Sequence, residues 1–255
     1  MKYRVESLRY SYGPKEVLHG VDFEIDSGEV VALLGPNGSG KSTLIRTVCN
    51  IDRPTSGRIL IDGKDIASMD IEELAKIISY VPQSGQYAEY DTVLDTVLVG
   101  RSPHMGWEPT ERDLEAVQNA MEYMGTLDLA DQYINELSGG QRQRVFISRS
   151  IAQEPKMFVF DEPTSSLDLK YQFDSMKMMA ELVHKDDSIM LVALHDLNLA
   201  LRFCDRIVMI KDGNVVCDGT PEGVLTSELI ESVYGVKTKI TDTDEGKFIL
   251  AYDSI

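Results

Sequence analysis

The chain has 255 residues, 43% of them hydrophobic, which suffices to bury the core of one large domain or of one domain with an added lobe. Its formal net charge is -17, and this argues against nucleic acid and anionic lipid as direct partners, because both are bound by basic surfaces. No apolar run approaches the roughly 20 residues that span a bilayer. We therefore expect any contact with a membrane to pass through a partner protein.

The N-terminal part of the chain predicts strands. Apolar and polar residues alternate around Val5 and Leu8, and again around Val21 and Ile25, a pattern that favours two antiparallel strands. A continuous apolar run at 29–34 follows and predicts a buried strand.

A glycine-rich loop comes directly after this run. Its residues form a complete G-x-x-x-x-G-K-[ST] motif, with Thr43 next: Gly35, Pro36, Asn37, Gly38, Ser39, Gly40, Lys41 and Ser42. Because a strand precedes the motif and a predicted helix over 41–49 follows it, the motif predicts a phosphate cradle. Backbone N–H groups and the helix N-terminus would face the β-phosphate. We expect Lys41 to reach the β- and γ-phosphates and the Ser42 hydroxyl to hold Mg²⁺.

The middle of the chain changes in character. Short strands are predicted at 58–61 and 77–81, and from 84 to 136 the periodicity becomes helical. Thr110, with Asp113 three residues later, resembles a capping pair that opens a helix.

Strand patterns return in the C-terminal part, with helices between them. They fall at 156–160, 188–194 and 206–211, and the tail at 237–255 predicts a hairpin. The pattern as a whole indicates an α/β core that is interrupted by a helical lobe.

The predicted strand at 157–160 ends in two carboxylates, Asp161 and Glu162. About 120 residues after a phosphate loop, an aspartate at a strand end is typical of the residue that holds the Mg²⁺ hydration shell. The next residue, Glu162, would polarise the attacking water, a general-base role typically worth about 10²–10⁴-fold. An acidic turn without chemistry is the alternative, and the position after a phosphate loop favours the catalytic interpretation.

Residues 137–141 read Leu-Ser-Gly-Gly-Gln and precede a predicted helix over 142–152. Small residues at a helix start leave N–H groups facing outward, which suits an anion. A simple helix cap is the alternative for this pentapeptide.

Taken together, these motifs resemble an ATP-binding-cassette (ABC) ATPase. Their order is the phosphate loop, Gln83 after Val81-Pro82, the pentapeptide, the carboxylate strand, Ser166-Leu167-Asp168 and His195. The resemblance covers residues 3–235. It implies a P-loop NTPase core of the α/β class, with a mixed sheet and flanking helices, an antiparallel β subdomain and an inserted α-helical subdomain. The implied parts of this single domain, 1–255, are 1–83 and 156–235 for the core with the β subdomain, 84–155 for the helical subdomain, and 236–255 for a tail.

The resemblance also implies roles within one subunit. Tyr12 would stack on the adenine of ATP, with Tyr10 as a rival for that position. Gln83 would contact Mg²⁺ and the attacking water, and Glu162 would be the base. His195 would contact the γ-phosphate and fix the position of the water. The implied ligands of Mg²⁺ are Ser42, Gln83 and Asp161.

Other implied roles require a second copy of the chain. The residues expected to bind the ATP held by the opposite subunit are Ser138, Gly139, Gly140 and Gln141, and Asp168 would line the interface. ATP would then close a head-to-tail dimer, and hydrolysis would reopen it. Further implied partners are a polytopic permease and, indirectly, a substrate-binding protein. The implied location is peripheral, on the cytoplasmic face of the inner membrane. The resemblance implies neither direct insertion into the membrane nor binding to nucleic acid.

Three segments narrow the resemblance further. The sequence Gly-Arg-Ser-Pro-His at 100–104 and the stretches 161–169 and 195–200 resemble the ATPases of importers for ferric siderophores, cobalamin and haem. Uptake of an iron chelate, haem or cobalamin is therefore the expected function. A molybdate-type importer ATPase and a soluble accessory ATPase of iron–sulfur cluster assembly remain as alternatives.

Overall fold

The structure is a computed structural model that describes residues 1–83, 91–244 and 246–254. The first residues of the expected helical lobe, 84–90, lie outside the described residues. The chain divides into two compact units, the first made of Met1–Ser68 and Val183–Ile255 and the second of Met69–Leu182.

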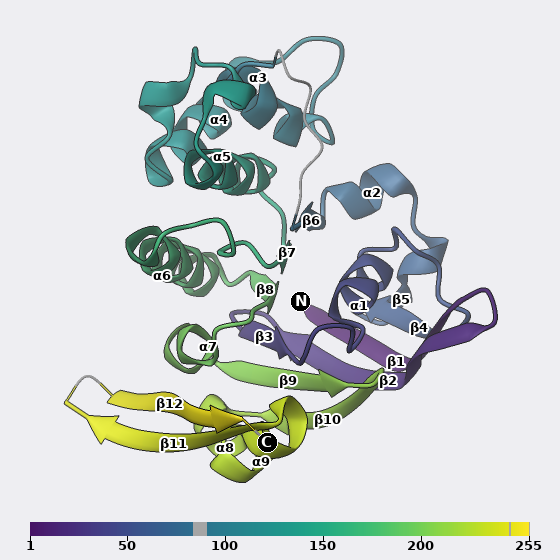
Figure 1. The fold of residues 1–255 in the computed structure, drawn as a ribbon. Helices are drawn as coiled ribbons and strands as arrows, with labels where there is room; N and C mark the ends of the chain where they lie inside the picture. The colour runs from purple at the N-terminus through teal and green to yellow at the C-terminus, as the bar shows by residue number, and fades with distance from the viewer. Residues whose placement is uncertain (84–90, 245, 255) are drawn as a thin grey trace. The chain divides into compact units, whose positions relative to one another are not determined.

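The first unit contains an antiparallel sheet. Its strands are β1 (Lys2–Tyr12), β2 (Lys15–Asp26), β4 (Ser56–Ile61) and β5 (Lys64–Asp65), in the order β2-β1-β4-β5 (Figure 1). Tyr3 and Val5 of β1 are buried while Arg4 between them is exposed, as expected for a sheet with one covered face. The antiparallel strands predicted before the phosphate loop are confirmed.

The first unit also contains strands of a second, mostly parallel sheet. The central strand β3 (Val30–Leu34) pairs in parallel with β8 (Ile189–Ala193) and β9 (Arg206–Lys211), and β10 (Asn214–Gly219) adds antiparallel to β9. Every residue of β3 and β8 is buried, which explains their uninterrupted apolar sequences. The helices α1 (Lys41–Val48) and α7 (Leu197–Phe203) follow β3 and β8.

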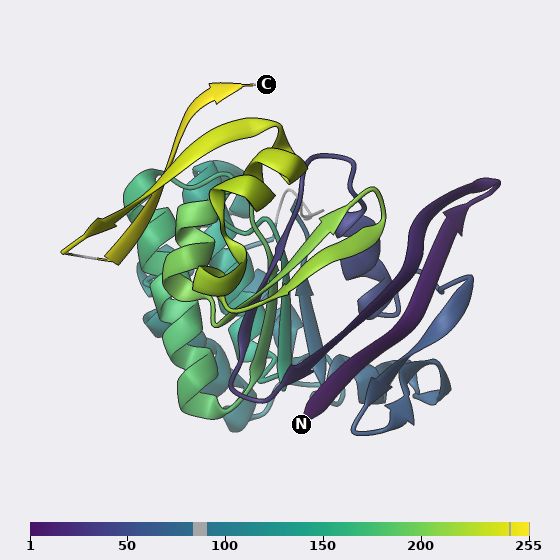
Figure 2. The same ribbon diagram turned by 90° about the horizontal axis from the view of Figure 1, so that it is seen from below.

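The predicted C-terminal hairpin is present. Its strands β11 (Val236–Thr243) and β12 (Gly246–Ser254) follow the helices α8 (Pro221–Val224) and α9 (Ser227–Tyr234) and pair antiparallel; in Figure 2 they are the yellow strands near the end marked C. The side-chain amide of Asn198 in α7 makes two hydrogen bonds with the backbone of Ile249, accepting from its N–H at 2.8 Å and donating to its carbonyl at 3.2 Å. These bonds attach β12 to α7.

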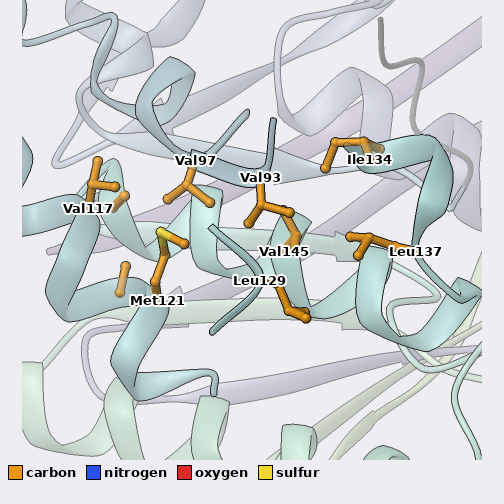
Figure 3. Packing of buried hydrophobic residues seen from close by; sticks show 10 residues of the cluster. Val93, Val97, Val117, Met121, Leu129, Ile134, Leu137 and Val145 are labelled. Carbon is orange, nitrogen blue, oxygen red and sulfur yellow. The ribbon is translucent and has the colours of Figure 1, made fainter. Parts of the chain in front are cut away.

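The second unit contains two parallel strands, β6 (Ile78–Val81) and β7 (Met157–Asp161), preceded by α2 (Ile71–Ala75). Its other described helices are α3 (Val93–Leu98), α4 (Glu111–Tyr123), α5 (Gly139–Ala152) and most of α6 (Leu169–Asp186), whose last turn belongs to the first unit, and short 3₁₀ turns include η2 (Val99–Arg101). In Figure 3, buried side chains of α3, α4 and α5 gather in one apolar cluster, with Val93, Val97, Met121 and Val145 among them. Among the described residues, none of the helices has both the length and the apolar character that a membrane span requires.

Two helix starts test the sequence patterns directly. Thr110 and Asp113 form the predicted capping pair, with the α4 helix beginning at Glu111. The helix predicted from 142 begins three residues earlier, at Gly139. A reciprocal pair of hydrogen bonds between Ser138 and Gln141 caps this first turn, and the cap offsets the low helix propensity of two glycines.

Candidate functional site

The phosphate loop of the first unit has a backbone that only glycine adopts freely. Gly35, Gly38 and Gly40 have φ of 153°, 77° and 106°, in the region that side chains disfavour. A Cβ on Gly35 would also lie 2.1 Å from the carbonyl oxygen of Ile210 in β9. The glycines of the motif are therefore required by the path of the loop itself.

Polar groups inside the loop fit an anion. Lys41 is only 6% exposed, and its Nζ donates to the carbonyl oxygens of Gly35 at 2.8 Å and Pro36 at 3.2 Å. The Oγ of Ser39 is buried without a hydrogen-bond partner among the described residues, an arrangement that costs free energy unless a ligand supplies the partner. An ammonium group, an unpartnered hydroxyl and the start of α1 thus lie together, and phosphate oxygens would satisfy all three.

His195 belongs to the same edge of the sheet. Strands β3 and β8 are parallel neighbours, with Leu33 opposite Ala193. The phosphate loop follows the carboxyl end of β3 and His195 follows that of β8, so both lie at the same edge of the sheet. His195 is exposed. The next residue, Asp196, caps α7 by accepting from the backbone N–H groups of Asn198 and Leu199 at 2.7 and 3.1 Å. Ligands of parallel sheets bind at this edge.

The two tyrosines proposed for adenine lie side by side at the end of β1. Tyr12 is 52% exposed, and its ring meets that of Tyr10 edge-on at a centroid distance of 4.9 Å. The greater exposure of Tyr12 fits the stacking role, and the role itself stays a prediction.

In the second unit, Gln83 and Glu162 are in direct contact. Strands β6 and β7 are parallel with Val81 opposite Phe160, so both residues follow carboxyl ends. The Nε2 of Gln83 donates to Oε2 of Glu162 at 2.5 Å. Glu162 has a φ of 55°, a left-handed conformation that costs about 1–3 kcal/mol in a non-glycine residue and is concentrated at functional sites. Its side chain is therefore held by a constrained backbone and by a fixed donor.

The segment Ser138–Gln141 lies against the turn that contains Asp168. Cβ atoms built on Gly139 and Gly140 would approach Ser166 at 3.7 Å and Leu167 at 3.4 Å. Asp168 caps α6 by accepting from the N–H of Tyr171 at 3.0 Å. The structure thus brings these two motifs together within the second unit, as it does Gln83 and Glu162.

The candidate residues are divided between the two units. Lys41 and His195 belong to the first, whereas Gln83, Asp161 and Glu162 belong to the second. The residues proposed to hold Mg²⁺ are Ser42, Gln83 and Asp161. They offer a hydroxyl, an amide and a carboxylate oxygen, and Mg²⁺ prefers oxygen ligands of these types.

The sequence patterns did not predict the burial of one charged residue, Arg101. Arg101 appears in the sequence only as part of the Gly-Arg-Ser-Pro-His segment, but its side chain is just 2% exposed and pairs with Asp113 at 3.0 Å and Glu154 at 2.8 Å. The position of Arg101 after the apolar run of α3 is the one signal of burial in the sequence.

Asp113 makes a testable contribution to stability in acid. Hydrogen bonds from the hydroxyl and backbone N–H of Thr110, with Arg101 beside them, lower the pKa of Asp113 to about 2. An unfolded aspartate has a pKa of about 3.9, so the ionised carboxyl stabilises the fold above that pH and the contribution is lost as pH falls through the folded pKa.

We therefore expect the difference in free energy of unfolding between the wild type and Asp113→Asn to be constant above about pH 5 and to shrink towards pH 2. Urea unfolding at a series of pH values measures this difference. A difference that does not vary with pH would contradict the assignment.

Comparisons with known proteins agree with these features. The family model described as ABC transporter matches residues 18–165. The ferric enterobactin transport ATP-binding protein FepC of Escherichia coli (strain K12) is 37% identical over 243 residues, which cover 94% of this chain and 89% of FepC. The hemin import ATP-binding protein HmuV of Gloeobacter violaceus is 38% identical over 231 residues, covering 88% and 84% of the two chains.

Solved structures show the same fold. An inward-facing transporter assigned to the metal-chelate type superposes with a TM-score of 0.85 at 28% identity, covering 98% of this chain and 97% of the other. A bacterial ABC transporter cassette solved as a dimer has a TM-score of 0.78 at 30% identity, covering 86% and 98%.

Proposed function

Because this chain belongs to the ABC transporter family and is one of its ATPases, we propose that it energises the uptake of an iron chelate, haem or cobalamin through a separate membrane permease. The observation that carries the proposal is the similarity, over nearly the whole chain, to ATP-binding proteins of enterobactin and hemin import. No comparison favours molybdate transport or iron–sulfur cluster assembly.

The first unit is proposed to bind the triphosphate. Backbone N–H groups of the phosphate loop and the Ser39 hydroxyl donate to phosphate oxygens, and Lys41 exchanges its backbone acceptors for the β- and γ-phosphates. His195 hydrogen-bonds the γ-phosphate, and Tyr12 stacks on the adenine. Charge-assisted hydrogen bonds of this kind are the strongest that side chains make with phosphate.

The second unit is proposed to activate water. Glu162 accepts a proton from the attacking water while the Gln83 amide holds its carboxylate in place. Ser42, Gln83 and Asp161 would hold Mg²⁺, which would supply positive charge to the phosphate oxygens during transfer. Asp161 and Glu162 are 4% and 8% exposed, so little bulk water competes with the attacking water for these two carboxylates.

A second copy of the chain is proposed to complete the site. The N–H groups at the start of α5, in Ser138–Gln141, would donate to the γ-phosphate held by the opposite copy, with Asp168 lining the interface. The dimeric cassette among the similar structures supports this arrangement. Because both copies contact one nucleotide, ATP favours the closed dimer and hydrolysis favours its opening.

The remaining partners are a polytopic permease and, through it, a substrate-binding protein, with the subunit peripheral on the cytoplasmic face of the membrane. An affinity pull-down from detergent-solubilised membranes, followed by mass spectrometry, tests this proposal. Recovery of a polytopic permease and a periplasmic or lipid-anchored binding protein is expected. Recovery of soluble cluster-assembly proteins alone would favour the iron–sulfur alternative.

A further inference from the structure

The C-terminal end of α5 is closed by two side chains from outside the helix. The Nη1 of Arg101 donates to the carbonyl oxygen of Ala152 at 2.7 Å, and Nε2 of His104 donates to that of Gln153 at 2.8 Å. The last carbonyls of a helix have no partner within it. The Arg101 guanidinium, a cation at this helix end, also interacts favourably with the helix dipole. Arg101 and His104 thus bind the end of α5 opposite to the Ser138 cap.

Arg101 is held rigidly in this position. Its Nε donates to Asp113 at 3.0 Å and its Nη1 to Glu154 at 2.8 Å, so two carboxylates compensate its buried charge. Asp113 is itself fixed by Thr110 at 2.6 and 2.9 Å. The guanidinium therefore joins η2, the start of α4 and the residues that follow α5.

The backbone of η2 also approaches α5 directly. A Cβ on Gly100 would lie 2.2 Å from the carbonyl oxygen of Arg149, a separation that no side chain tolerates. Glycine at this position lets η2 touch α5, and it brings Arg101 within reach of the helix end.

The same end of α5 is attached to β6. The side-chain amide of Gln153 donates to the carbonyl oxygens of Ala75 at 2.6 Å and Ile78 at 2.9 Å. Strand β6 ends at Val81, two residues before Gln83. A continuous set of hydrogen bonds therefore links the helical cluster, α5 and the strand that presents Gln83.

We infer that Arg101 and His104 are positioning residues for ATP hydrolysis: they fix α5 relative to β6, and so keep the Ser138–Gln141 donors in register with Gln83. The inference rests on the proposed function of those two groups. A helix of 14 residues is about 21 Å long, so a tilt of about 5° at one end moves the other by about 2 Å. A misplacement of about 1 Å at a reacting group can reduce a rate about 10²-fold.

The test uses ATP-driven dimerisation of subunits that carry Glu162→Gln, measured by light scattering. Adding Arg101→Lys is expected to raise the ATP concentration at half-maximal dimerisation about tenfold, because the single ammonium nitrogen of lysine cannot occupy the positions of both Nε and Nη1. The affinity of each subunit for ADP should stay within twofold, because the groups proposed to bind ADP, the phosphate loop and Tyr12, belong to the first unit.

His104 provides a second, surface variant. It is exposed beside a hollow of about 600 Å³, so truncation leaves no buried cavity. His104→Ala is expected to shift dimerisation in the same direction, and His104→Gln, whose amide nitrogen reaches the position of Nε2, should restore it. The matched control is Arg112→Ala, because Arg112 lines the same hollow, is 82% exposed and lies 4.0 Å from Glu154.

The possible failures are distinguishable. A parent Glu162→Gln subunit that never dimerises with ATP would refute the proposed two-copy site and the inference with it. A parent that dimerises, with Arg101→Lys and His104→Ala showing the same ATP dependence, would overturn the inference alone. A parallel loss of ADP affinity in both variants would also overturn it, since it would indicate general unfolding rather than misplacement of α5.

Discussion

Replacing Glu162 by glutamine is expected to lower the rate of ATP hydrolysis by about 10²–10⁴-fold, the usual contribution of a general base. Glutamine has the same shape and accepts a hydrogen bond from Gln83 through its amide oxygen, so the site should keep its structure. It cannot accept the proton of the attacking water. Turnover is measured from phosphate release, and ATP affinity from calorimetry on the same preparation.

The affinity of Glu162→Gln for ATP is expected to match that of the wild type, because the phosphate loop lies in the other unit of the chain. Glu181→Gln, a change at an exposed glutamate of α6, is the matched control and should leave both quantities unchanged. Turnover near the wild-type rate in Glu162→Gln would exclude Glu162 as the base.

Replacing Lys41 by alanine is expected to weaken ATP binding, whereas Glu162→Gln lowers the hydrolysis rate and leaves ATP binding unchanged. Hydrogen bonds to charged groups contribute about 1.5–3 kcal/mol, and about 1.4 kcal/mol corresponds to tenfold in affinity, so we expect ATP to bind about 10–100-fold more weakly. The carbonyl oxygens of Gly35 and Pro36 also lose their donor, which loosens the loop. Calorimetric titration with ATP measures the change.

Lys177→Ala is the control for Lys41→Ala, because Lys177 is an exposed lysine on α6 and its loss should not alter ATP affinity. The thermal unfolding of Lys41→Ala should show that the variant is folded. A folded Lys41→Ala protein with full affinity for ATP would contradict the assignment of the phosphate loop.

Local patterns in the sequence were sufficient to predict much of this fold. The phosphate loop depends on glycines, a strand and a helix that are adjacent in the chain, and the Thr110–Asp113 cap spans three residues. The uninterrupted apolar runs of β3 and β8 are likewise a direct consequence of burial on both faces.

Features that depend on distant residues could not be read from these patterns. The contact between Gln83 and Glu162 joins positions 79 residues apart, and it exists because β6 and β7 pair in parallel. The burial of Arg101 depends on carboxylates at 113 and 154. The early start of α5 depends on a capping box that outweighs glycine's low helix propensity.

The most direct test of the proposed function is uptake by vesicles that contain this subunit and the permease recovered with it. Radiolabelled ferric siderophore, haem and cobalamin are offered, together with the recovered binding protein, to vesicles loaded with MgATP. We predict accumulation of one of these ligands that requires ATP and is lost in Lys41→Ala and Glu162→Gln. Active ATP hydrolysis in these vesicles without accumulation of any of the three would contradict the account.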